Sequence, residues 1–86
     1  MKKLQLFEQF GSLIITRNAI RDLFDSLADG PIVLDFNGIE FISRSAAHEY
    51  IRGKTSSPYD IKEINMSKNI RAMFILVAKQ LKNIVN

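Results

Sequence analysis

The sequence predicts a small α/β domain, in which a mixed β-sheet of three or four strands is packed by three helices. Short apolar stretches rich in β-branched residues alternate with longer stretches whose apolar residues recur at helical spacing. Turn-forming residues separate these stretches, notably at Gly11-Ser12, at Asn37-Gly38 and over residues 54–59. A chain of 86 residues has the size of one domain, so residues 1–86 are expected to fold as a single unit.

The first elements predicted are two short strands and a helix. Leu4–Phe10 has apolar residues at alternating positions, and Leu13–Ile15 is expected to pair back to it across the Gly11-Ser12 turn. Thr16 is placed to cap the helix that follows, whose apolar residues recur at helical spacing. Asp29-Gly30-Pro31 supplies a glycine and a proline that stop this helix.

The middle of the chain predicts a second strand and a second helix. Ile32–Phe36 is short and apolar, as expected of a strand that is covered on both faces. The Asn37-Gly38 turn follows this strand. Either Ser43 or Ser45 can then cap a helix that reaches Gly53.

The last third predicts a short strand over Asp60–Asn65 and a long final helix. Asn65 or Ser67 begins that helix, which is expected to run to about Leu81. Because a helix crosses from the strand of residues 32–36 to this last strand, the two strands should be parallel.

The composition argues against catalysis and against bound metals. The chain has no cysteine, a single histidine and no glycine-rich loop, which excludes disulfides, thiolate or imidazole-rich metal sites and a phosphate cradle. His48 lies three residues after Ser45, but a histidine at a helix edge is the commoner explanation. Asp35 and Glu40 flank a turn, where solvated side chains are commoner than a carboxylate pair. We therefore expect that the chain is not an enzyme and binds no cofactor.

The sequence also predicts a cytoplasmic protein with no membrane partner. The longest unbroken apolar run, Ala72–Ala78, is far shorter than the roughly 20 residues of a membrane-spanning helix. Residues 1–8 are too polar and too few for a signal peptide.

The net charge of +3 is unevenly distributed along the chain. Residues 65–86 contain four basic residues and no acidic one, which indicates an acidic partner for this segment. A solvated face is the commoner explanation for the cations alone, but an apolar residue ringed by cations has the composition of an interface anchor. On the predicted last helix, the cations share one face with a central isoleucine: Lys68, Arg71, Ile75, Lys79 and Lys82.

Residues 34–46 form a second candidate surface. A strand ends near Asp35, the chain turns, and a serine-rich helix start follows. Free backbone N–H groups, the positive helix end and Arg44 would together favour an anion here, whereas two caps and a turn that only connect elements are the alternative. The candidate partner-binding residues of this ledge are Asn37, Gly38, Ser43, Arg44 and Ser45.

The sequence Asp-Phe-Asn-Gly-Ile-Glu-Phe-Ile-Ser-Arg-Ser-Ala at 35–46 resembles the signature of STAS domains, the fold of anti-sigma-factor antagonists. Their pattern runs Asp-x-Ser-Gly-Val-x-Phe-Ile-Asp-Ser-Ser-Gly. Over about residues 10–80, the chain is more similar to the short STAS-like domains of unknown function. The corresponding motifs are Thr16-Arg17, Asp35-Phe36, Ser43-Arg44-Ser45 and Asn65-Met66-Ser67.

The resemblance implies a STAS-like scaffold and a protein partner with a kinase-type ATPase fold. By position, Ser43 stands where the antagonists have aspartate, and Arg44 stands where they have the serine that a partner kinase phosphorylates. Ser45 matches their second serine, and Ala46 replaces their glycine. The docking surface is therefore expected without the phosphorylation switch.

The resulting prediction is a non-enzymatic regulatory domain that binds a protein. The alternative is a small nucleic-acid-binding or antitoxin-like protein that uses the basic last helix. Against that alternative, no aromatic residues are interleaved with the cations, and no helix-turn-helix pattern precedes them. Homo-oligomerisation stays open.

Overall fold

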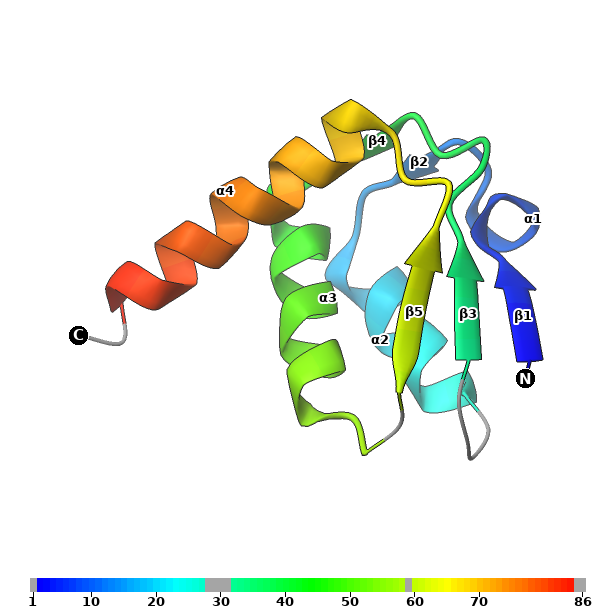
Figure 1. The fold of residues 1–86 in the computed structure, drawn as a ribbon, viewed down its shortest axis with the longest axis horizontal. Coiled ribbons are helices and arrows are strands. Elements are labelled where there is room, and N and C mark those ends of the chain that lie inside the picture. Colours follow the sequence, from blue (N-terminus) through cyan, green and yellow to red (C-terminus); the bar gives the residue numbers. More distant parts are fainter. Residues whose placement is uncertain (1, 28–31, 59, 85–86) are drawn as a thin grey trace.

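The computed structural model describes residues 2–27, 32–58 and 60–84, and its main frame is a three-stranded parallel sheet (Figure 1). The strands are β1 (Lys2–Gln5), β3 (Ile32–Asp35) and β5 (Ile61–Ile64), in the order β1-β3-β5. The predicted α/β class is confirmed, and so is the parallel pairing of the last two strands.

Two helices, α2 (Arg17–Ser26) and α3 (Arg44–Ser56), lie beside each other against this sheet, and α4 (Lys68–Ile84) packs on α3 (Figure 1). On the opposite face of the sheet, a row across the strands holds Lys3, Val33 and Lys62. Both lysines are exposed and Val33 is half-buried. The expectation that β3 is covered on both faces is therefore wrong.

The N-terminal segment differs from its prediction. Only the first residues form β1, and the predicted strand continues instead as a short helix, α1 (Leu6–Phe10). β2 (Leu13–Ile14) does not pair back across the turn but pairs in parallel with β4 (Phe41–Ile42). The predicted pairing across a two-residue turn would have been antiparallel. Instead, β1 pairs in parallel with β3 and β2 pairs in parallel with β4.

Hydroxyl side chains begin the three long helices. The Oγ1 atom of Thr16 and the Oγ atoms of Ser43 and Ser67 each accept a hydrogen bond from the backbone N–H three residues later, at 3.1, 3.1 and 3.2 Å. The prediction for Thr16 is confirmed. Of the alternatives left open by the sequence, Ser43 rather than Ser45 caps α3, and Ser67 rather than Asn65 caps α4.

The ends of α2 and α3 depend on different features. α2 ends at Ser26, and the predicted stop at Asp29-Gly30-Pro31 lies outside the described residues. α3 continues to Ser56, beyond the predicted end at Gly53. A Cβ atom at Gly53 would lie 2.7 Å from the ring of Phe24. The glycine therefore allows α2 and α3 to approach each other closely.

The core fills the space between the sheet and the long helices. Leu34 of β3 and Leu23 of α2 are fully buried at its centre. Four aromatic rings with centroids 4.9–6.1 Å apart connect α2, the end of β3, α3 and α4: Phe24, Phe36, Tyr50 and Phe74. Edge and tilted contacts of this kind stabilise a core beyond the burial of the rings.

The rotation of α4 matches the predicted helix phase. Ile70 and Val77 are buried in the core, whereas Ile75 is 52% exposed. Ile75 therefore stands on the solvent face, as the sequence predicts. Within the described ranges, no helix is long and apolar enough to cross a membrane.

Candidate functional site

The carboxyl end of β3 holds a buried carboxylate. The Asp35 side chain, 6% exposed, accepts hydrogen bonds of 2.9 Å from the Asn37 N–H and from Asn65 Nδ2, and Lys3 Nζ lies 3.6 Å away. The bond from Asn65, then that from Asn37, lowers the pKa of Asp35, while burial of the carboxyl opposes this effect. The predicted solvated turn is wrong for Asp35, because these donors replace water around the carboxylate.

The Asn37-Gly38 turn is exposed, but its backbone is shaped by the fold. Gly38 has a φ of +91°, a region that glycine enters without strain. A Cβ atom at Gly38 would lie 2.8 Å from the ring of Phe7. Glycine at this position therefore also allows Phe7 of α1 to pack closely against the turn. Of the two residues, only Asn37 has a side chain, and it is exposed.

Ser43 joins β2 to the start of α3. Its hydroxyl accepts the capping bond from the Ala46 N–H, donates to the carbonyl of Ile15 and lies 3.2 Å from Ser45 Oγ. The fold therefore uses the hydrogen-bonding groups of the Ser43 side chain. The neighbouring Arg44 is exposed, and no ion pair holds it within the part of the chain that the structure describes.

Three large apolar side chains lie beside this ledge on the outer face of β2 and β4. Leu13 and Phe41 are direct partners in the strand register, and Ile15 follows Leu13 on the same face. Their exposed fractions are 49% for Leu13, 46% for Phe41 and 54% for Ile15. We call Leu13, Ile15 and Phe41 the β2–β4 patch.

The β2–β4 patch was not predicted from the sequence as a site. The residues that follow Leu13 and Phe41 in their strands, Ile14 and Ile42, are buried. Both faces of these two short strands are therefore apolar, although only one of them reaches the core. That lack of a polar face is the signal by which the patch could have been found.

The cations predicted on the last helix form an exposed stripe along α4. The three ion pairs among the described residues involve Lys3, Arg21 and Lys54, so no acidic side chain in that part of the chain neutralises the stripe. We call this set the α4 stripe: Lys68, Arg71, Ile75, Lys79 and Lys82.

The ledge and the α4 stripe do not form one site. α4 begins beside β4 and then runs away from it along α3 (Figure 1). Since Ser43 bonds to Ile15, the structure brings the ledge together with the β2–β4 patch instead.

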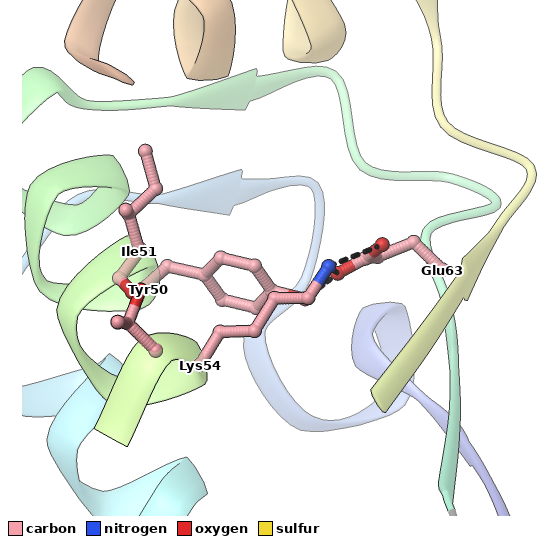
Figure 2. A network of polar contacts seen from close by, with 5 residues as sticks. Tyr50, Ile51, Lys54 and Glu63 are labelled. Carbon is pink, nitrogen blue, oxygen red and sulfur yellow. Dashed lines mark hydrogen bonds and ion pairs between the residues drawn. The ribbon is translucent and has the colours of Figure 1, made fainter. Parts of the chain in front are cut away.

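A polar network fastens α3 to β5 (Figure 2). The hydroxyl of Tyr50 donates to Glu63 Oε2 at 2.6 Å, and Lys54 Nζ lies 2.8 and 3.0 Å from the two carboxylate oxygens of Glu63. Burial raises the pKa of Tyr50, and the adjacent Glu63 raises it further. Glu63 lies two residues after the buried Ile61 in β5, so both side chains are on the same face of the sheet. An acidic residue on this inward face could have indicated from the sequence that Glu63 has a buried hydrogen-bonding partner.

Ser45 and His48 lie three residues apart on α3. The Oγ atom of Ser45 lies 3.2 Å from Ser43 Oγ. His48 is half-buried, and its Nδ1 atom is buried without a hydrogen bond. Within residues 2–27, 32–58 and 60–84, no group of three His, Cys, Asp or Glu side chains is placed to hold a metal ion.

Comparison of the chain with protein families, with curated proteins and with solved structures finds no match.

Proposed function

We propose that this chain is a non-enzymatic regulatory domain that binds a protein partner through the β2–β4 patch and the adjoining ledge. The observation that carries the proposal is the patch itself, in which Leu13, Ile15 and Phe41 are each about half exposed on neighbouring strands. Adjacent large apolar side chains on a surface are typical of interaction sites, whereas single exposed ones need no explanation.

The chemistry of this surface suits a protein interface. The buried centres of such interfaces are more apolar than the rest of the surface and are enriched in aromatic residues and arginine. Arg44 can give two parallel hydrogen bonds to a carboxylate of the partner. The backbone pairing of β2 and β4 and the Ser43–Ile15 bond hold the surface in place before binding, which reduces the ordering cost.

The proposed binding is constitutive. In the resemblance to anti-sigma-factor antagonists, Arg44 takes the place of the phosphorylated serine, so the usual acceptor hydroxyl is missing. Phosphate on Ser43 would remove the donor hydrogen from its bond to Ile15. The same resemblance supports a partner with a kinase-type ATPase fold.

Nucleic-acid binding through the α4 stripe is the competing function. The four cations of the stripe form no ion pair among the described residues, which favours this function. The apolar centre of the stripe, Ile75, and the apolar β2–β4 patch have no role in contacts to phosphates. These two features favour the protein partner.

The test is affinity capture of the tagged chain from a nuclease-treated extract of its native host, with quantification of the captured proteins. Arg44→Glu should reduce capture of the main partner by about tenfold or more, because a hydrogen bond between charged groups contributes roughly 1.5–3 kcal/mol. Arg52→Glu is the matched control, since Arg52 is an exposed arginine further along the same helix. Ile15→Asp should abolish capture.

Two results would contradict the proposal. Equal capture by the wild-type chain, by Arg44→Glu and by Ile15→Asp would exclude this surface, and a partner captured only without nuclease treatment would indicate a nucleic acid. Stoichiometric phosphate on Ser43 or Ser45 in cells would separately contradict constitutive binding.

A further inference from the structure

An open groove of about 370 Å³ runs between α3 and α4 beside the end of β5. Its lining is largely apolar and includes Met66, Phe74 and Ile75, together with Lys54 and Arg71. A cavity of about 150 Å³ holds a benzene molecule. The groove therefore has room for two apolar side chains of that size.

The groove offers positive charge and no free carboxylate. Among the described residues, Glu63 is the only acid that lines the groove, and both of its carboxylate oxygens are bound by Tyr50 and Lys54 (Figure 2). Arg71 forms no ion pair among the described residues. Ile75 belongs both to the groove and to the α4 stripe, so the apolar cleft opens directly onto the row of cations.

We infer that the α3–α4 groove is a second binding site, whose occupant is an acidic amphipathic helix of another protein. Apolar side chains of that helix enter the groove against Phe74 and Ile75, and its carboxylates face Arg71 and the other cations of the α4 stripe. The proposal is independent of the β2–β4 patch, because the two surfaces share no residue.

The spacing of the stripe favours a helical occupant. Its cations lie four and seven residues to either side of Ile75 along α4, from Lys68 to Lys82, a rise of about 21 Å. A helix of about 14 residues laid along α4 repeats at the same spacing, so its acids and its apolar anchors fall on one face. Electrostatic attraction of this kind raises the association rate and fixes the orientation of the partner.

A second copy of the chain does not match this site. A second α4 would bring the same cations, and residues 65–86 contain no acid. α2 carries the exposed acids Asp22 and Asp25, but Arg17 and Arg21 lie on the same helix. Nucleic acid would satisfy the cations and leave the apolar groove unfilled.

The experiment is a selection of random peptides displayed against the purified wild-type chain, followed by fluorescence anisotropy with the enriched peptides. Enriched sequences should combine Asp or Glu with Leu, Ile or Phe at helical spacing. Ile75→Asp should weaken their binding by about tenfold or more, as loss of an interface anchor does. Arg71→Glu should do the same, while thermal unfolding of both variants stays close to that of the wild type. Ile15→Asp, the matched control at an equally exposed isoleucine, should bind as the wild type does.

The inference is wrong if the selection enriches no acidic amphipathic sequences, or if Ile75→Asp and Arg71→Glu bind the peptides normally. It is also wrong if Ile15→Asp removes binding, because the peptides would then occupy the β2–β4 patch. Tighter binding of a single-stranded oligonucleotide with a steep salt dependence would assign the stripe to nucleic acid. A dimer that Ile75→Asp dissociates in sedimentation experiments would assign it to a second copy.

Discussion

The Asp35 carboxylate joins three segments that are far apart in the sequence. It receives a hydrogen bond from Asn37 beyond its own strand and one from Asn65 at the end of β5, and it faces Lys3 of β1. Asn65 adopts a φ of +59°, a left-handed conformation that asparagine tolerates better than most residues. Because each of these neighbours favours the ionised carboxylate, folding should depend on the charge of Asp35.

The dependence on this charge predicts a loss of stability in acid. The pKa of Asp35 is lowered in the folded state from its ordinary value of 3.8, so its contribution is complete above pH 3.8 and disappears as the pH falls through the folded pKa. The free energy of unfolding, measured in urea from neutral to acid pH, should therefore fall less steeply below pH 3.8 in Asp35→Asn than in the wild type. Asp25→Asn, at an exposed acid of α2, is the control and should retain the wild-type slope. Identical slopes for Asp35→Asn and the wild type would exclude the role given to this carboxylate.

Individual residues were predictable where their partners are local. Thr16 and Ser43 cap helices through amides three residues away, a pattern that is visible in the sequence. Asp35 is held by a donor thirty residues away, and its burial was not predicted. No local pattern around a carboxylate at a turn distinguishes solvation from a partner brought by the fold.

At the scale of elements, β3 is the central strand, and its environment decides what a substitution costs. Leu34 is fully buried in the middle of β3, whereas Leu13 of β2 stands half exposed in the β2–β4 patch. The two leucines are chemically identical and both belong to parallel pairs. Any difference between their alanine variants therefore reports burial.

Leu34→Ala should lower the free energy of unfolding by about 2–5 kcal/mol, since it removes buried methyl groups and leaves a cavity. Leu13→Ala should lower it by less than about 1 kcal/mol, because little buried surface is lost. Urea denaturation of both variants measures the difference. Equal effects would contradict the assignment of Leu13 to an open surface.

The long helices were predictable and the N-terminal elements were not. α2, α3 and α4 each combine a hydroxyl cap with apolar residues at helical spacing, so cap and pattern agree. Leu4–Phe10 alternates like a strand, yet Leu6 and Phe10 are also four residues apart and fit one helix face. The choice between the two depends on the pairing of β1 with β3, a contact across some thirty residues that a short pattern does not contain.

At the scale of the whole molecule, the β2–β4 patch and the α4 stripe lie on different elements. The patch is the outer face of β2 and β4, and α4 contacts β4. The buried Ile42 of β4 and the buried face of α4 belong to the same core. The exposed side chains of the two surfaces, Ile15 and Ile75, each point away from that core. The sequence indicated the α4 stripe through its charge pattern, but the groove beside it requires α3 and β5 to be in place.

This arrangement predicts that the two surfaces act independently. Substitutions at distant exposed sites without shared partners add within about 0.3–0.5 kcal/mol, so the double variant Ile15→Asp/Ile75→Asp should have the stability given by the sum of the two single changes. Its binding losses should also be separate: Ile15→Asp alone should lose the protein captured through the patch and retain the acidic peptides, and Ile75→Asp alone should do the reverse. The complete cycle compares the wild type, the two single variants and the double variant. Urea denaturation measures stability, affinity capture measures binding through the patch, and anisotropy measures binding of the acidic peptides. A coupling well above 0.5 kcal/mol, or loss of both ligands in one single variant, would mean that the contact between β4 and α4 transmits changes from one surface to the other.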